Sequence, residues 1–92
     1  MTDKRWNVTV DITEHGDDTY AQAALAVVDG VSVSGTGHAR RSPDDQSVPE
    51  IGDELAAARA LARLSHSLYQ AAVREMISRQ AGIEETADLD LW

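Results

Sequence analysis

The chain has 92 residues, no cysteine and a formal net charge of −8. This length allows one domain with a single small core, and the missing cysteines exclude a disulfide framework and any cysteine-based metal site or nucleophile. The acidic balance works against binding to phosphate backbones through the overall field of the molecule, because such binding relies on positive charge.

The start of the chain, MTDKRW, precedes no apolar run of signal-peptide length. No stretch approaches the roughly eighteen apolar residues of a membrane span. We therefore expect a cytoplasmic protein that does not cross a membrane.

The first predicted element is a strand over residues 6–13. Polar residues alternate there with an apolar set formed by Trp6, Val8, Val10 and Ile12. A period of two with β-branched and aromatic residues is typical of a strand with one buried face. Residues 14–18 have the composition of a turn.

Two further strands are expected over residues 19–28 and 31–40. The alanines of the first also fit a helix, but Asp29 and Gly30 stand between two apolar runs and indicate a two-residue hairpin. One face of the last strand carries Gly35, Gly37 and Ala39. Such small residues either leave room for a helix backbone or mark a bulge.

The spacing of apolar residues over positions 49–81 predicts one long helix that stops at Gly82. Gly52 costs about 1 kcal/mol in a helix, so regular helix is expected only from Asp53. Large apolar residues and alanines recur every three or four positions and form one stripe: Ile51, Leu55, Ala58, Leu61, Leu64, Leu68, Ala72 and Met76. Ala56, Ala57 and Ala60 widen this apolar surface.

The expected fold is therefore α+β, with a three-stranded antiparallel sheet followed by one long C-terminal helix. Residues 1–82 form this single domain, and residues 83–92 form an acidic tail. A helix of about thirty residues spans roughly 45 Å and a seven-residue strand only about 23 Å. We therefore expect the helix to overhang the sheet.

No catalytic, cofactor or metal site is expected. His15, His38 and His66 are scattered over a turn, a strand and the helix, and no pair has the spacing of a metal motif. The glycines around Thr36 lie in a predicted strand and lack the lysine and following helix of a phosphate-binding loop. We therefore expect a protein that is not an enzyme.

Two surfaces remain as candidates for binding. The first is an anion or nucleic-acid patch of four arginines, which is the basis of an alternative function as a nucleic-acid-binding protein: Arg40, Arg41, Arg59 and Arg63. The alternative is that these arginines pair internally with Glu54, Asp44 or Asp45.

The second candidate is an apolar interface on the helix overhang and the tail, formed by Val73, Met76, Ile77, Leu89, Leu91 and Trp92. An exposed apolar patch often marks an interface, and self-association as a homodimer is the simplest form of it. Another protein is the other expected partner. The alternative is that the tail folds back and covers the patch within one chain.

Three segments carry a resemblance to a known family: WNVTVDI at 6–12, GHARRSP at 37–43 and VPEIGDELAAARAL at 48–61. Over about residues 5–75 the chain resembles a family of small actinobacterial proteins of unknown function. The resemblance implies a fold of the double-stranded-RNA-binding-domain-like group and brings no catalytic residues. RNA-binding members of that fold present a basic helix start to phosphates. Glu50, Asp53 and Glu54 stand there instead, so we expect no nucleic-acid partner.

Overall fold

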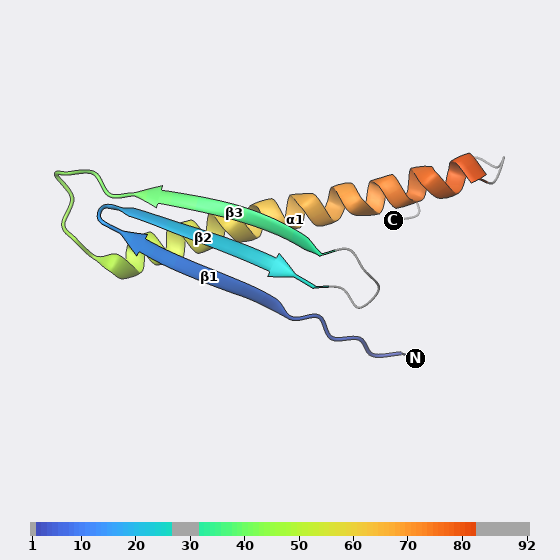
Figure 1. The fold of residues 1–92 in the computed structure, drawn as a ribbon, viewed down its shortest axis with the longest axis horizontal. Coiled ribbons are helices and arrows are strands. Elements are labelled where there is room, and N and C mark those ends of the chain that lie inside the picture. Colours follow the sequence, from blue (N-terminus) through green and yellow to red (C-terminus); the bar gives the residue numbers. More distant parts are fainter. Residues whose placement is uncertain (1, 27–31, 83–92) are drawn as a thin grey trace.

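The computed structural model describes residues 2–26 and 32–82. The elements follow in the order β1 (Val8–His15), β2 (Asp18–Leu25), β3 (Val33–Arg40) and α1 (Pro49–Gly82). The strands form one antiparallel sheet in the order β1-β2-β3, and α1 crosses one of its faces (Figure 1). The predicted α+β fold is confirmed.

The first hairpin is tighter than the predicted turn over residues 14–18. β1 runs to His15 and β2 begins at Asp18, which leaves Gly16 and Asp17 as the turn. Gly16 has a φ of 62°, and a positive φ at the first turn position is typical of a type II′ hairpin. The expected hairpin at 29–30 lies outside the described residues, and Leu25 and Val33 form the last strand pair on either side of residues 26–32.

The glycines of β3 allow the backbone of α1 to lie directly against the strand. A Cβ atom at Gly35 would lie 2.6 Å from the carbonyl oxygen of Ala60 and would collide with the backbone nitrogen of Leu64. At Gly37 it would collide with the carbonyl oxygen of Ala56. The pairing of β3 with β2 is continuous, so these glycines serve the close approach of the helix and mark no bulge.

The face of α1 that meets the sheet differs in part from the predicted stripe, of which Leu64 is buried. The buried helix residues are Ala56, Ala60 and Leu64, whereas Ile51 and Leu55 are exposed. Large side chains do not fit where a helix backbone touches strand glycines, so alanine occupies this face. The expected start at Asp53 is also wrong, because the helix begins at Pro49.

Gly52 has a packing reason within the first turns of α1. A Cβ atom there would lie 2.8 Å from the hydroxyl oxygen of Thr19, which is buried on β2. The residue that weakens the helix locally therefore lets its first turns approach the sheet.

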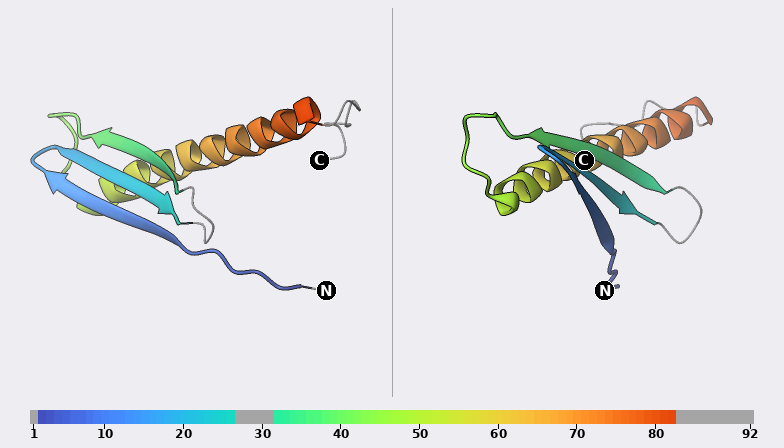
Figure 2. Two further views of the ribbon diagram at one scale, coloured as in Figure 1. Left: turned by 45° about the vertical axis from the view of Figure 1, so that its right-hand side comes forward. Right: turned by 60° about the vertical axis from the view of Figure 1, so that its left-hand side comes forward.

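The helix overhangs the sheet, as its length predicts. Its 34 residues span about 51 Å, whereas strands of eight residues span about 26 Å. The C-terminal half of α1 runs past the ends of the strands in each view (Figures 1 and 2). Among the described residues, no helix combines the length and the apolar character needed to cross a membrane.

Candidate interaction surfaces

The described part of the chain buries small side chains and exposes many large ones. Its buried hydrophobic residues are five alanines and two leucines, whereas ten large hydrophobic residues are exposed. The exposed group comprises Trp6, Val8, Ile12, Tyr20, Val48, Ile51, Leu55, Leu61, Tyr69 and Ile77. Single exposed apolar residues are normal, but rows of them mark interfaces. Their arrangement on the fold therefore decides where a partner fits.

One edge of the sheet, on β3, is covered by side chains of α1. In a hairpin with a two-residue loop the closing residues exchange both backbone hydrogen bonds, and bonding then alternates along the strands. This alternation turns the carbonyls of Ser34 and His38 away from β2. Ser67 Oγ donates to Ser34 O at 3.3 Å, and Arg59 Nη1 donates to His38 O at 2.7 Å. The helix thus occupies hydrogen-bonding positions along this edge.

The other edge, on β1, has no comparable cover among residues 2–26 and 32–82. The same alternation turns the backbone groups of Val8, Val10, Ile12 and Glu14 away from β2. α1 packs chiefly against β3 and β2, and it touches β1 far less (Figure 2). An uncovered edge strand of eight residues is a template for pairing with a further strand.

The side chains along this edge form an apolar row on the face that carries α1. Val8 and Ile12 are opposite the buried Leu25 and Ala21 of β2, so they share that face. Val8 is 44% exposed and Ile12 is 43% exposed, whereas Val10 is partly buried against the core. Trp6, two residues before β1, is 59% exposed. We call Trp6, Val8, Val10 and Ile12 the β1 row.

Two leucines of α1 lie on the same side of the helix as Glu50. After Asp53, the charge of Glu50 also raises the pKa of Glu14, so the first turns of α1 lie near this end of β1. Leu61 and Leu68 follow Glu50 by eleven and eighteen residues, which is about three and five turns. Leu61 is 42% exposed and Leu68 is partly buried against the core. These two leucines therefore lie on the same side of the helix as Glu50.

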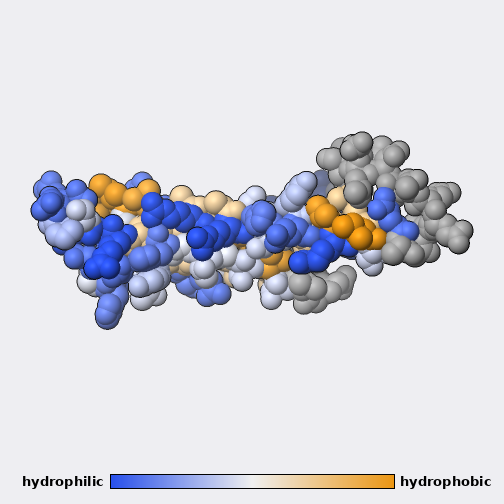
Figure 3. Space-filling view, turned by 90° about the horizontal axis from the view of Figure 1, so that it is seen from above, coloured by the Kyte–Doolittle hydropathy of each residue, from blue (hydrophilic) through white to orange (hydrophobic). Residues whose placement is uncertain are grey.

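The predicted interface on the overhang is only partly exposed. Ile77 is 52% exposed, whereas Val73 and Met76 are partly buried. Hydrophobic side chains gather over the C-terminal half of α1 in the space-filling view (Figure 3). The other three predicted interface residues, Leu89, Leu91 and Trp92, lie outside the described residues.

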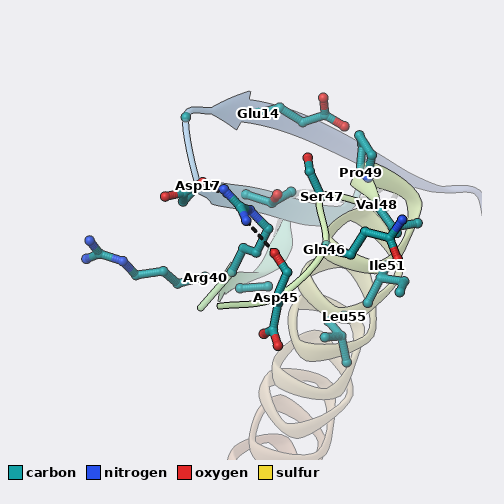
Figure 4. Close-up of a pocket in the computed structure, with 15 residues that line it drawn as sticks. Glu14, Asp17, Arg40, Asp45, Gln46, Ser47, Val48, Pro49, Ile51 and Leu55 are labelled. Atoms are coloured by element: carbon teal, nitrogen blue, oxygen red, sulfur yellow. Dashed lines mark hydrogen bonds and ion pairs between the residues drawn. The ribbon is translucent and has the colours of Figure 1, made fainter. Parts of the chain in front are cut away.

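Arg40 and Arg41, adjacent at the end of β3, differ in their contacts. The Arg41 guanidinium lies 2.6 Å from Asp17 Oδ1 and donates to the carbonyl oxygen of Asp45 at 2.6 Å. Arg40 is 73% exposed, lies 4.0 Å from Asp18 Oδ1 and extends away from the neighbouring cavity (Figure 4). The acids that pair with these arginines come from the first hairpin. Of the acids predicted to pair, only Asp45 takes part, through its backbone.

The other two predicted arginines lie on α1. Arg59 donates to the carbonyl oxygen of His38, and Arg63 is exposed one turn further along. Arg40 belongs to the outer face of the sheet, opposite the face on which α1 lies. The structure therefore distributes the four arginines over two faces.

A cavity of about 390 Å³ lies between the first hairpin, the loop before α1 and the first turns of the helix (Figure 4). Its lining mixes polar and apolar groups, among them Thr19, Arg41, Ser47, Ile51 and Leu55. The contacts of Arg41 with the hairpin and with the loop form one wall. Sequence reasoning missed this cavity, because its lining comes from three separate segments.

Three acids gather where β1 passes the start of α1. The carboxyl of Asp53, through hydrogen bonding and its charge, raises the pKa of Glu14 above its ordinary value of 4.5. Desolvation and the charge of Glu50 raise this pKa further. Asp53 Oδ1 is buried and has no hydrogen-bond partner among the described residues. We call Glu14, Glu50 and Asp53 the acidic cluster.

The histidines do not converge on one site. His38 stacks on Tyr20 with ring centroids 4.7 Å apart, and its Nε2 lies 2.7 Å from Asp18 Oδ1 on the outer face of the sheet. His15 ends β1, and His66 is exposed on α1. Within residues 2–26 and 32–82, no three histidine, aspartate or glutamate side chains are grouped so as to hold a metal ion.

Comparison with known proteins places the chain in a family. The model of the family described as Rv2632c-like matches residues 4–85. The chain belongs to the Rv2632c-like family. The uncharacterised protein Rv2632c of Mycobacterium tuberculosis is 44% identical over 66 residues, which cover 72% of this chain and 70% of that protein. The uncharacterised protein Mb1767 of Mycobacterium bovis is 40% identical over 73 residues, which cover 79% of this chain and 77% of that protein.

A solved structure supports the fold of this Rv2632c-like chain. The crystal structure of Rv2632c superposes with a TM-score of 0.78 at 37% identity, and it covers 86% of this chain and 93% of that one. These mycobacterial relatives agree with the small actinobacterial family that the sequence resembles. Their names assign no activity.

Proposed function

We propose that this chain is a small non-enzymatic interaction domain that associates with itself. The observation that carries the proposal is the distribution of apolar side chains over residues 2–26 and 32–82, where mostly alanine is buried and ten large residues are exposed. Burying a large aliphatic or aromatic side chain contributes about 1.5–3 kcal/mol. A partner that covers these exposed side chains would therefore be bound favourably. A second copy is the simplest such partner.

The test is sedimentation velocity between about 1 and 300 µM, a range chosen for weak association, combined with thermal unfolding at both ends of it. We expect a mass that rises above the 9.9 kDa of one chain and a melting temperature that increases with concentration. A constant monomer mass with a constant melting temperature would contradict self-association.

The alternative function, nucleic-acid binding through Arg40, Arg41, Arg59 and Arg63, has less support. Arg41 and Arg59 are engaged with groups of the same chain, and the acidic cluster lies at the start of α1. The double-stranded-RNA-binding-like grouping concerns the fold, and a fold does not imply a function. Salt-dependent retention on duplex RNA that Arg40→Ala or Arg63→Ala weakens would favour this alternative over ours.

A further inference from the structure

We infer that β1 pairs antiparallel with β1 of a second copy, centred on Thr9, so that two three-stranded sheets join into one sheet of six strands. The inference rests on the proposed self-association and assigns it a surface and a register. Both copies of α1 would then lie on the same face of the joined sheet, with the β1 rows between them.

The backbone of β1 restricts how it can pair with itself. The outward-facing N–H and C=O groups belong to Val8, Val10, Ile12 and Glu14, by the alternation set at the hairpin. A two-fold pair must place these residues opposite one another. The centres that lie within β1 and do not place Val8 opposite Gly16 of the first hairpin or a later residue are Val8, Thr9, Val10 and Asp11.

The side chains favour the centre at Thr9. On the face that carries α1, this register pairs Val8 with Val10, Trp6 with Ile12, and Lys4 with Glu14. Apolar residues thus meet apolar residues, and opposite charges meet at both ends. Directly opposed pairs of these kinds stabilise antiparallel strands, whereas like charges destabilise them.

The other three centres each oppose an apolar residue with a charged one. A centre at Val10 places Trp6 opposite Glu14, and a centre at Asp11 places Val8 opposite Glu14. A centre at Val8 places Lys4 opposite Ile12. In the Thr9 register the outer face is also complementary, because Asn7 meets Asp11, Arg5 meets Thr13 and Asp3 meets His15.

The acidic cluster supplies a second argument for this register. Among the described residues, Glu14, Glu50 and Asp53 form no ion pair with a cationic side chain. The Thr9 register brings Lys4 of the second copy to Glu14. Residues 2–7 continue past the start of β1 in the direction of the strand, which is where this pairing needs them (Figure 1).

The size of the contact sets the expected affinity. One pair of edge strands with its side-chain row is a small interface, and interfaces below about 1,200 Å² are characteristic of weak complexes. We therefore expect a dimer that dissociates in the micromolar range.

The first test compares two lysine substitutions by sedimentation velocity. Val8→Lys places a charge opposite Val10 of the second copy, whereas Leu55→Lys is its control, since both wild-type side chains are 44% exposed. We expect Val8→Lys to raise the dissociation constant at least about tenfold, because a charge would be buried unpaired. Leu55→Lys should leave it unchanged.

The outcomes separate this inference from the proposed function. A dimer that persists in Val8→Lys and dissociates in Leu55→Lys or Ile77→Lys overturns the β1 pairing and keeps self-association on the helix. A wild-type chain that stays monomeric overturns both. Circular dichroism establishes that each variant is folded before its mass is interpreted.

The register has a test of its own, a charge exchange. Lys4→Glu and Glu14→Lys should each weaken the dimer roughly fivefold to tenfold, because like charges then face each other at both ends. The double variant Lys4→Glu/Glu14→Lys should recover most of the wild-type affinity. A double variant that dimerises no better than the singles overturns the register centred on Thr9.

Discussion

Replacing Gly35 with alanine perturbs the fold where α1 touches β3 most closely. The added Cβ would lie 2.6 Å from Ala60 O and 2.8 Å from the carbonyl carbon of Arg63, and it would collide with the nitrogen of Leu64. All three are backbone atoms of a continuous helix, so no side-chain rotation relieves the contact. The helix must lift from the sheet or the strand must bend.

The size of the effect follows from overpacking. Forcing an extra methyl group into a packed core costs about 1–3 kcal/mol, and the rigid backbone on every side favours the upper end. Alanine recovers about 0.5–1 kcal/mol of chain entropy relative to glycine. We therefore expect a net loss of about 2 kcal/mol, which lowers the melting temperature of a domain this small by about 8–16 °C. The free energy of unfolding of the whole domain is only about 5–14 kcal/mol.

The assay is urea unfolding followed by circular dichroism at low protein concentration. Ser34→Ala is the matched control, since Ser34 is the neighbouring residue on the exposed face, and it should change stability by less than about 0.5 kcal/mol. A Gly35→Ala protein as stable as wild type would refute the contact between helix backbone and strand.

Two further predictions concern charged groups, measured at about 1 µM, below the expected association range. Arg41→Ala should lower stability by about 1 kcal/mol, because it removes a half-exposed ion pair to Asp17 and the bond to the loop, whereas Arg40→Ala should change it by less than about 0.5 kcal/mol. Glu14→Gln should raise the melting temperature at pH 7, since the pKa of Glu14 is raised in the folded chain, mainly by Asp53. The penalty of the ionised Glu14 is complete above that pKa and absent below 4.5, so the difference from wild type should vanish near pH 4. An equal loss in both arginine variants, or a Glu14→Gln effect independent of pH, would contradict these assignments.

Much of the fold could be predicted because local patterns carry it. Alternation over residues 6–13 indicates β1, and the small residues of β3 indicate the close approach of a helix. The comparison of helix and strand lengths predicts the overhang. The tight first hairpin was missed because Glu14, His15 and Asp18 have turn-like composition, yet Gly16 with its positive φ and Asp17 make the whole turn.

The orientation of α1 could not be predicted from its own pattern. Leucines and alanines both recur at helical spacing, and hydrophobicity alone favours the leucines as the buried set. Gly35 and Gly37 change that choice, because direct backbone contact puts Ala56 and Ala60 against the sheet together with Leu64 and leaves Leu55 exposed. This tertiary constraint leaves large residues outside.

The candidate surfaces could be predicted from the sequence only in part, for the same reason. The alternation over residues 6–13 suggested a buried face, and only the placement of α1 over β2 and β3 leaves the β1 row exposed. The sequence identified the overhang as an apolar surface. The cavity and the acidic cluster depend on contacts between distant segments, which no local pattern encodes.

Amide hydrogen exchange along β1 tests most directly whether its free edge is the association surface. The amides of Thr9 and Asp11 point to β2 and should be protected at every concentration. The amides of Val8, Val10 and Ile12 point outward, so we expect them to become protected only as the protein concentration rises through the dimer transition. Fast exchange of these three amides in a sample that sedimentation shows to be dimeric would contradict the account.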